Sequence, residues 1–313
     1  MVEVPVAIEE PPAPQPIRQG FHNIDHLIDE MLADMLVRPA EARRRIADRL
    51  GVSPESIVAL ETSRVNIPLD LNAIFADPLG KGLVDEYRRF KELLASFDPS
   101  PMGHAYAELL TPRFVDLYFR DSITRVYHLA QMLREFGVHS GSILEVGSLF
   151  CTFAGALQRL GYAVTVIDRY RQFGGALDVF LDDFRSSGGT VVETDEAHEI
   201  EALGKLGKFD AVISLAVVEH IPHTPREFLG ALAAHVRPGG VLAIDTPNIA
   251  RFYNRQFLNE GKSIHQPIEY QFPSSVPFEG HHREYTADEV RWMLEQTGCK
   301  DIRIELFDYN IFQ

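Results

Sequence analysis

The chain has 313 residues, of which 45% are hydrophobic and 24% charged, a composition typical of an ordinary globular protein. Its formal net charge of −15 at pH 7 opposes binding of a polyanion by bulk charge, and no apolar run approaches the length of a membrane span. The two cysteines, Cys151 and Cys299, form no CxxC pair, which argues against a disulfide framework or a cysteine zinc site. We therefore expect a cytoplasmic protein that binds neither a membrane nor a nucleic acid.

Residues 1–20 are acidic and proline-rich and lack the basic start and apolar core of a signal peptide, so a disordered leader is expected. From residue 21 to about residue 138 the apolar spacing is helical, with helices predicted at 22–36, 84–94 and 113–136. The sequence thus predicts a helical N-terminal domain over residues 21–138 that covers an acceptor site or forms a homodimer contact.

One segment of this helical region, residues 43–65, resembles a DNA-binding helix-turn-helix, with Ser53 placed to cap the second helix. A recognition helix offers Arg, Lys, Asn or Gln to base edges, whereas this one offers Glu55, Ser56 and Glu61. A DNA-binding regulator is therefore kept as an alternative function, and helical packing or a dimer contact is favoured for the segment.

After Gly141 the pattern changes to short strands rich in Val and Ile that alternate with helices. Strands are predicted at 142–146, 163–167, 190–193, 209–214, 240–245 and 301–307, and helices at 150–159, 173–186 and 225–236. This alternation predicts an α/β fold in residues 139–313: a Rossmann-like, doubly wound, mostly parallel sheet, with the helical N-terminal domain as an addition. Its ligand is expected at the carboxyl ends of the strands, beside the first strand.

Acidic residues follow three successive strands of this predicted sheet. Glu145 lies near the end of the first, Asp168 ends the second, and Asp195 follows the third. The spacing from Gly147 to Asp168 is that expected for an acid that binds ribose hydroxyls in a doubly wound fold. Asp195 is placed to accept a hydrogen bond from an adenine amino group. Three acids at successive strand ends predict a site for an adenosine-containing cofactor.

The turn after the first strand, in SILEVGSLFCTF, contains a single glycine, Gly147. A dinucleotide fold needs a second glycine so that the backbone can approach a pyrophosphate, and Leu149 and Cys151 obstruct that approach. NAD and FAD are therefore disfavoured. A cofactor that carries adenosine without phosphate needs only the tight turn and the acids, and S-adenosylmethionine is such a cofactor.

The stretches Lys208–Asn248 and Gly280–Cys299 resemble the class I S-adenosylmethionine-dependent methyltransferases, in the branch with a Val-Glu-His turn after the fourth strand and Pro-Gly-Gly before the fifth. The resemblance covers about residues 141–307. It implies S-adenosyl-L-methionine as cofactor, with its methionine end, ribose and adenine held by Glu145, Gly147, Ser148, Asp168, Arg169, Asp195, Glu196 and Ser214. Leu149 and Cys151 depart from the glycine-rich loop of that family.

Methyl transfer to a hydroxyl gains from a base of near-neutral pKa, which points to histidine. The candidates at strand ends are His220, with Glu219 beside it, and His281 of the pair His281-His282, while His223 is interpreted as a cap of the turn. These residues carry the predicted catalytic role. The alternative is that Glu219 and His220 only hydrogen-bond the backbone.

A metal site is a competing interpretation of the same residues. Some relatives hold Mg²⁺ with an acid-rich Glu-His turn and a later histidine, which Glu219, His220 and His281 match in part. The further acid expected three positions before Glu219 is Ala216 here. Because hard cations take several oxygen ligands, no metal is predicted.

The acceptor is predicted to be a small molecule. Ser214-Leu215-Ala216 stands where amine methyltransferases carry an Asp/Asn-Pro-Pro-aromatic motif, which disfavours a nucleobase amine. The aromatic-rich connection at 249–279 suggests a lid over an organic acceptor or packing against the helical region. We expect O-methylation of a sugar or secondary metabolite. Transfer of another group from S-adenosylmethionine and methylation of nitrogen stay open.

Overall fold

The structure, a computed structural model, describes residues 78–102, 110–194, 199–222, 224–265, 268 and 280–306. Residues 68–305 form one compact unit, and the sheet and helices that follow belong to it. The leader at 1–20, the helix predicted at 22–36 and the helix-turn-helix-like segment at 43–65 lie outside the described residues. Within the described part, no helix combines the length and apolar character needed to cross a membrane.

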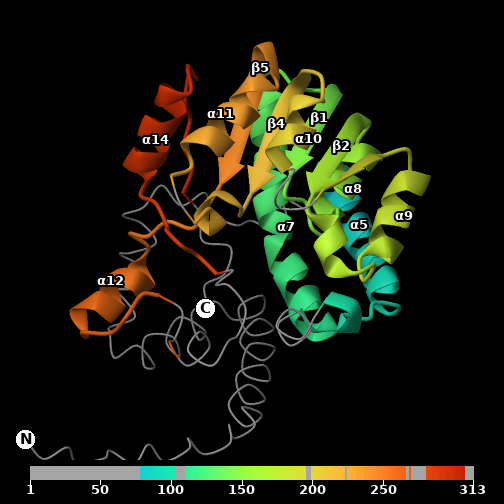
Figure 1. Cartoon of the computed structure of the whole chain (residues 1–313), viewed down its shortest axis with the longest axis horizontal. Coiled ribbons are helices and arrows are strands. Elements are labelled where there is room, and N and C mark those ends of the chain that lie inside the picture. Colours follow the sequence, from blue (N-terminus) through green and yellow to red (C-terminus); the bar gives the residue numbers. More distant parts are fainter. Residues whose placement is uncertain are drawn as a thin grey trace, which may run out of the picture. The chain divides into compact units, whose positions relative to one another are not determined.

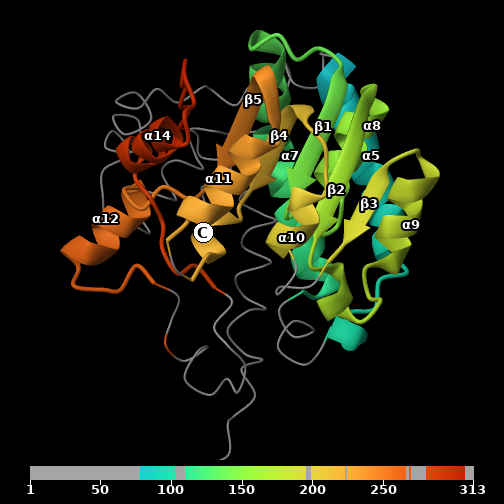
Figure 2. The same cartoon turned by 45° about the horizontal axis from the view of Figure 1, so that its top comes forward.

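The described strands form a five-stranded sheet in the order β3-β2-β1-β4-β5, in which every pairing is parallel (Figure 1, and Figure 2 for β3). The strands are β1 (Gly141–Val146), β2 (Tyr162–Asp168), β3 (Thr190–Glu193), β4 (Phe209–Leu215) and β5 (Val236–Asp245). The chain builds outward from β1 to β3 and then returns to place β4 on the other side of β1. This topology confirms the predicted doubly wound α/β sheet and creates a switch point between β1 and β4.

Helices cover both faces of the sheet because successive strand residues point to opposite sides. On β1, Ile143 packs into one core cluster and Leu144 into the other. Figure 2 shows α10 and α11 on one side of the sheet and α5, α7 and α8 on the other. The first side carries α10 (Glu199–Gly204), α11 (Arg226–Ala234) and α14 (Ala287–Gln296), and the second carries α5 (Pro78–Leu94), α7 (Pro112–Glu135), α8 (Thr152–Arg159) and α9 (Asp178–Ser186).

Helices α5 and α7 belong to the region that the sequence assigned to a separate helical domain. In the structure, Leu79 and Leu133 from these helices are fully buried in the same core cluster as Ile143 of the sheet. The packing of the described residues therefore shows no boundary near residue 138. Helix α5 starts at Pro78, earlier than the predicted start at residue 84.

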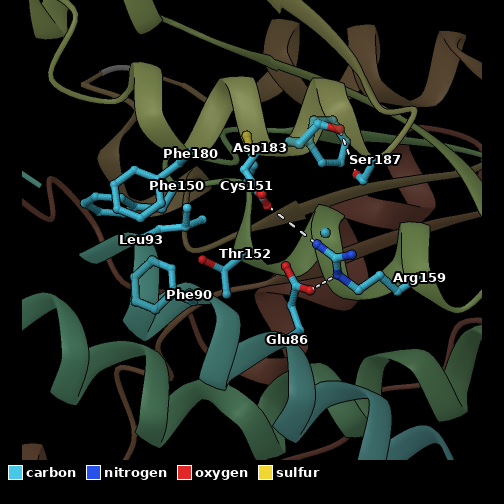
Figure 3. Close-up of a pocket in the computed structure, with 12 residues that line it drawn as sticks. Glu86, Phe90, Leu93, Phe150, Cys151, Thr152, Arg159, Phe180, Asp183 and Ser187 are labelled. Carbon is cyan, nitrogen blue, oxygen red and sulfur yellow. Dashed lines mark hydrogen bonds and ion pairs between the residues drawn. The ribbon is translucent and has the colours of Figure 1, made fainter. Parts of the chain in front are cut away.

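A partly buried ion-pair network joins α5, α8 and α9 (Figure 3). Arg159 of α8 pairs with Glu86 of α5, and its second nitrogen lies 3.5 Å from Asp183 of α9. Arg89 of α5 also pairs with Asp183. The same three helices line a small pocket whose other wall is aromatic, with Phe90, Phe150, Phe180 and Phe184. The loop that follows β1 thus rests on a rigid helical layer.

Several predicted boundaries differ from the structure. Strand β5 begins at Val236 instead of 240, because Phe209 pairs with Val236 and the register then shifts before Ala211 pairs with Val241. Helix α9 begins at Asp178 instead of 173, after glycines with positive φ at 174 and 175. The sixth strand predicted at 301–307 is wrong over the described residues 301–306, which pair with no strand of the sheet. Helix α12 (Phe252–Asn259) forms within the predicted loop at 249–279.

Candidate functional site

The candidate site lies at the carboxyl ends of β1, β2, β4 and β5. In a parallel doubly wound sheet these ends meet at one edge, and ligands bind at the switch point, which here lies between β1 and β4. The predicted residues Glu145, Asp168 and Ser214 lie at the last or next-to-last positions of their strands. Glu219 lies in the 3-10 turn Val218–His220 that comes after β4. Their common position follows from topology rather than from proximity in the sequence.

Gly147 makes the turn that leaves β1. Its φ of +80° is one that side-chain-bearing residues rarely adopt, and a Cβ on it would overlap the Val217 side chain after β4. Its backbone N–H donates to the Ile167 carbonyl on β2 at 2.9 Å. Only glycine lets the loop from β1 pass this close to the segment that follows β4.

Two later positions of the loop have the left-handed backbone conformation that glycine usually adopts, although neither is glycine. Leu149 and Cys151 have φ of +45° and +55°. Between them, Phe150 is 2% exposed and inserts into an aromatic cluster. Its ring centroid lies 5.0–6.0 Å from those of Phe180, Phe97, Phe119 and Phe90. Burial of Phe150 offsets the left-handed conformations on either side of it.

Asp168 fixes this loop from β2. One carboxylate oxygen accepts the Leu149 N–H at 2.7 Å and the other accepts the Arg169 N–H at 2.7 Å. Burial raises the pKa of Asp168, and these two backbone donors act against that rise. Each carboxylate oxygen has a second acceptor site, so the group retains the capacity to bind ribose hydroxyls while it holds the loop.

A buried cluster of two hydroxyls and a thiol lies under the loop. The Tyr170 hydroxyl is hydrogen-bonded to Ser148 Oγ and lies 3.2 Å from Cys151 Sγ. Burial raises the pKa of the Cys151 thiol to about 12, so this thiol is not a nucleophile at neutral pH. The Ser148 hydroxyl, predicted to contact the methionine end of the cofactor, is engaged by Tyr170.

The end of β1 carries an unusually basic carboxyl group. Burial, with a smaller effect of Asp168, raises the pKa of Glu145 to about 8, against opposing effects of Arg125 and the Ala154 backbone. Glu145 Oε2 is buried without a hydrogen-bond partner among the described residues. A cationic ligand group at this position would satisfy both the missing hydrogen bond and the charge.

Arg125 of α7 was not predicted as a site residue. Its side chain is 2% exposed, and its Nε lies 3.6 Å from Asp245 at the end of β5. Burial raises the pKa of Asp245, and Arg125 opposes that rise. Asp245 could have been found by the rule that found Asp168, an acid at a strand end. Arg125 carries no such signal, because a lone arginine in a helix is ordinarily solvated.

Other predicted cofactor residues have mixed positions. The Ser214 hydroxyl donates to the Val146 carbonyl at 3.0 Å and ties β4 to β1. Arg169 follows β2 and is half-buried. Asp195 and Glu196 lie outside the described residues, as does His223. The predicted adenine contacts therefore stay predictions.

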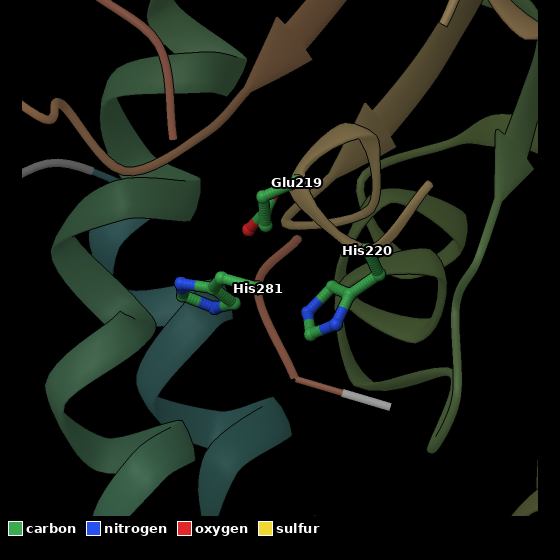
Figure 4. A group of neighbouring side chains, drawn as sticks. All are labelled: Glu219, His220 and His281. Carbon is green, nitrogen blue, oxygen red and sulfur yellow. The ribbon is translucent and has the colours of Figure 1, made fainter. Parts of the chain in front are cut away.

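The structure brings the predicted catalytic residues together from two distant segments (Figure 4). The Glu219 carbonyl accepts the N–H of His282 at 2.8 Å and that of Arg283 at 3.3 Å, which docks the 280–286 segment on the turn after β4. The His220 and His281 rings then meet edge to face with centroids 4.9 Å apart. The Glu219-His220 turn therefore also contacts the 280–286 segment, in addition to the hydrogen bonds of its own backbone.

The Glu219 side chain is fully buried beside these rings. Oε2 accepts the Thr246 hydroxyl at 3.0 Å, while Oε1 is buried without a hydrogen-bond partner among the described residues. Burial raises the pKa of Glu219 to about 7, with Asp245 adding to the rise and His281 opposing it. At neutral pH this carboxyl group is therefore partly protonated.

Ligand atoms of Glu219, His220 and His281 all lie within 4.8 Å of one another, so the three side chains form a candidate cation site. One carboxylate and two imidazoles suit a borderline transition metal such as Zn²⁺. They suit Mg²⁺ poorly, because Mg²⁺ takes an octahedral set of oxygens. The side chain at Ala216 supplies no further ligand.

Comparison with known proteins gives a family and a set of relatives. The model of a methyltransferase domain family matches residues 118–304, more than half of the chain. A ubiquinone biosynthesis O-methyltransferase of Paramagnetospirillum magneticum is 33% identical over 132 residues, 38% of this chain and 51% of that protein. A tRNA U34 carboxymethyltransferase of Chromohalobacter salexigens is 27% identical over 169 residues, 54% of this chain and 43% of that protein. The chain thus spans about half the length of the curated relatives it matches.

Among solved structures, magnesium protoporphyrin IX methyltransferase from Synechocystis with bound SAH has a TM-score of 0.41 and 17% identity, over 58% of this chain and 76% of that chain. The family match, read with the parallel sheet and its switch point, confirms the predicted enzyme class and cofactor. The chain belongs to the family of class I S-adenosylmethionine-dependent methyltransferases.

Proposed function

We propose that the chain transfers a methyl group from S-adenosylmethionine to a hydroxyl group of a small organic molecule, with His281 as the general base. The observation that carries this proposal is the edge-to-face pair of His220 and His281 over the buried carboxyl of Glu219. The side chain of His281 is 40% exposed, so an acceptor can reach it. The likeness to an O-methyltransferase supports oxygen as the accepting atom. Neither of the two relatives named above supports the narrower prediction of a sugar or secondary metabolite.

The cofactor is proposed to lie along the ends of β1 and β2. Its ammonium group would approach Glu145, whose buried Oε2 lacks a partner among the described residues. Its ribose hydroxyls would bind the two oxygens of Asp168 that already hold the loop. Methyl transfer is an in-line displacement, so holding the sulfonium in line with the acceptor oxygen supplies much of the rate.

Isothermal titration calorimetry with S-adenosylmethionine tests the cofactor site. The full chain should bind S-adenosylmethionine with a measurable Kd. Asp168→Ala should raise that Kd at least 10-fold, because it removes the ribose contacts and the hydrogen bond that holds the Leu149 backbone. Asp182→Ala, which removes an exposed acid from α9 away from the strand ends, serves as the matched control and should bind normally. Equal affinity for the full chain and Asp168→Ala would overturn the assignment.

The acceptor and the donated group are found by incubating the protein with S-adenosylmethionine and a panel of phenols, catechols, sugars and tRNA. We expect an O-methylated small molecule, identified by the mass of the product. A carboxymethylated tRNA product would instead favour the activity named for the Chromohalobacter relative. A chain with net charge −15 is poorly suited to hold tRNA, which favours the small molecule.

A metal-assisted reaction is the second candidate, supported by the three ligand atoms of Glu219, His220 and His281. A cation held there would lower the pKa of a bound acceptor hydroxyl. Activity that is abolished by a chelator and restored by Zn²⁺ or Mn²⁺ would favour this candidate. Activity that survives dialysis against a chelator but is lost in His281→Gln would favour the base. His139→Gln, on the exposed loop before β1, is the control for loss of a histidine.

A further inference from the structure

Glu284 of the 280–286 segment contacts the imidazole of His281, and no sequence pattern predicted this contact. Its Oε1 lies 3.0 Å from Nδ1 of His281, three residues earlier. The Glu284 side chain is only 11% exposed, whereas that of His281 is 40% exposed. The carboxyl group is therefore more deeply buried than the ring that it contacts.

Helix α12 holds Glu284 from the other side. Asn254 is 1% exposed and donates its Nδ2 to Glu284 Oε2 at 3.2 Å and to the Ile249 carbonyl at 3.0 Å. Arg251 Nε in turn donates to Asn254 Oδ1 at 3.0 Å, and a guanidinium nitrogen of Arg251 lies 3.8 Å from Glu284 Oε1. Both carboxylate oxygens thus have partners, and the orientation of the group is fixed by residues that follow β5.

The charge of Glu284 decides the direction of its bond to His281. Asn254 Nδ2 donates to one of its oxygens, and the guanidinium of Arg251 lies 3.8 Å from the other, so both neighbours favour the carboxylate form. The group is then ionised at neutral pH and can only accept hydrogen bonds. Nδ1 of His281 must carry the hydrogen, so in the neutral ring Nε2 keeps its lone pair.

We propose that Glu284 is a positioning residue for His281: its hydrogen bond holds the neutral imidazole as the Nδ1–H tautomer and leaves Nε2 free to take the acceptor proton. The inference rests on the proposed role of His281 as base. In the reaction the acceptor oxygen forms a bond to the methyl carbon as the carbon–sulfur bond breaks. S-adenosylhomocysteine leaves with the electron pair of that bond, and the acceptor proton moves to Nε2 of His281. The imidazolium that results is stabilised by Glu284 and later loses its proton to water.

The tautomer can be observed without any acceptor. Long-range ¹H–¹⁵N NMR spectra of the full chain labelled with ¹⁵N-histidine distinguish the two neutral tautomers, and His281→Gln identifies the His281 signals. In the wild-type chain, at a pH where the ring is neutral, we expect the Nδ1–H form. Glu284→Gln and Glu284→Ala should each increase the Nε2–H fraction of His281.

Glu289→Gln is the matched control for this experiment. Glu289 lies in α14, directly after this segment, and caps the helix through Thr286. Among the described residues its hydrogen bonds go to Thr286 and Arg283 and not to His281, so its replacement should leave the His281 tautomer unchanged. An Nε2–H tautomer in the wild-type chain would overturn the proposal. An unchanged tautomer in both Glu284 variants would overturn it as well.

Turnover separates this inference from the proposed function. With an acceptor found by the product screen, Glu284→Gln should lower kcat by roughly 10- to 100-fold and leave the Kd for S-adenosylmethionine unchanged. If the tautomer changes in Glu284→Gln but His281→Gln retains full turnover, the base role of His281 is wrong although Glu284 does orient the ring. If His281→Gln is inactive but Glu284→Gln is fully active with an unchanged tautomer, the positioning role is wrong and the base role stands.

Discussion

The backbone N–H of Leu149 donates a hydrogen bond of 2.7 Å to the carboxylate of Asp168, although Leu149 has a φ of +45°. The loop after β1 therefore has the conformation of a glycine-rich turn at positions occupied by side-chain-bearing residues. Two anchors maintain it: Asp168 from β2, and Phe150 in the aromatic cluster of the helical layer. Several properties of the site depend on these anchors.

Leu149→Gly should be more stable than Leu149→Ala, whereas at most positions glycine is the less stable of the two. Glycine usually destabilises an ordinary backbone position relative to alanine, but a left-handed conformation costs alanine about 1 kcal/mol that glycine does not incur. Since both variants lose the same leucine side chain, the Gly variant should have the larger free energy of unfolding. Urea denaturation of the pair measures the difference, and a more stable Ala variant would show that the loop is not left-handed at 149.

Phe150→Ala should couple loss of stability to loss of cofactor binding. Removing a buried phenylalanine costs about 3–5 kcal/mol, and here it also releases the loop between Leu149 and Cys151. Phe184→Ala removes an equally buried ring from α9, on the same side of the sheet. Under conditions where both variants are folded by circular dichroism, calorimetry should detect weaker S-adenosylmethionine binding in Phe150→Ala alone. Equal affinities would mean that Phe150 serves stability only.

Gly147→Ala should abolish cofactor binding or the fold. The added Cβ overlaps Val217, and the position has a positive φ, so both the strain and the contact disfavour alanine. The double variant Gly147→Ala with Val217→Ala removes the overlap and should recover part of the lost stability, leaving about 1 kcal/mol of backbone strain. Thermal denaturation of Gly147→Ala, Val217→Ala and the double variant tests this, and no recovery in the double variant would contradict the close approach of the two segments.

Glu145 should make the stability of the cofactor-free protein fall as pH rises. The ordinary pKa of the group is 4.5 and its pKa in the fold is about 8, so between these values the native state holds a proton that the unfolded chain has released. The contribution of Glu145 to the free energy of unfolding is therefore greatest below about pH 4.5. It decreases as the pH rises to about 8, by an amount on the order of a few kcal/mol. Other carboxyl groups are superimposed on this dependence, so the comparison is between variants.

Glu145→Gln should be more stable than the wild-type chain at pH 9, and this advantage should shrink towards pH 5. Urea denaturation at pH 5, 7 and 9 measures the difference, with Glu227→Gln on the exposed surface of α11 as the control. A constant difference across this pH range would mean that Glu145 does not titrate as the structure indicates.

S-adenosylmethionine should bind the wild-type chain more tightly at pH 8.5 than at pH 6.5, because its cationic groups favour the ionised form of Glu145.

Local patterns in the sequence predicted the elements of the sheet well. Alternating short apolar strands and helices led to β1 through β4 within one or two residues, because a buried parallel strand needs a continuous run of β-branched residues. The start of β5 was missed, since Pro238, Gly239 and Gly240 are ordinarily turn residues and only pairing with β4 extends the strand through a bulge. The proposed site at the strand ends followed from the same topology, and its acids Glu145 and Asp168 were found at the expected places.

What the sequence alone determined is the family, the fold class and the set of acids and histidines that the strand ends present, since these depend on residue type and short-range periodicity. Only the tertiary structure placed Glu219, His220 and His281 in one cluster, because the two segments are joined by backbone hydrogen bonds that no spacing encodes. It also revealed Arg125, Asp245 and Glu284 as members of the site. Their importance comes from burial and from partners distant in the chain, and these are properties of the folded molecule.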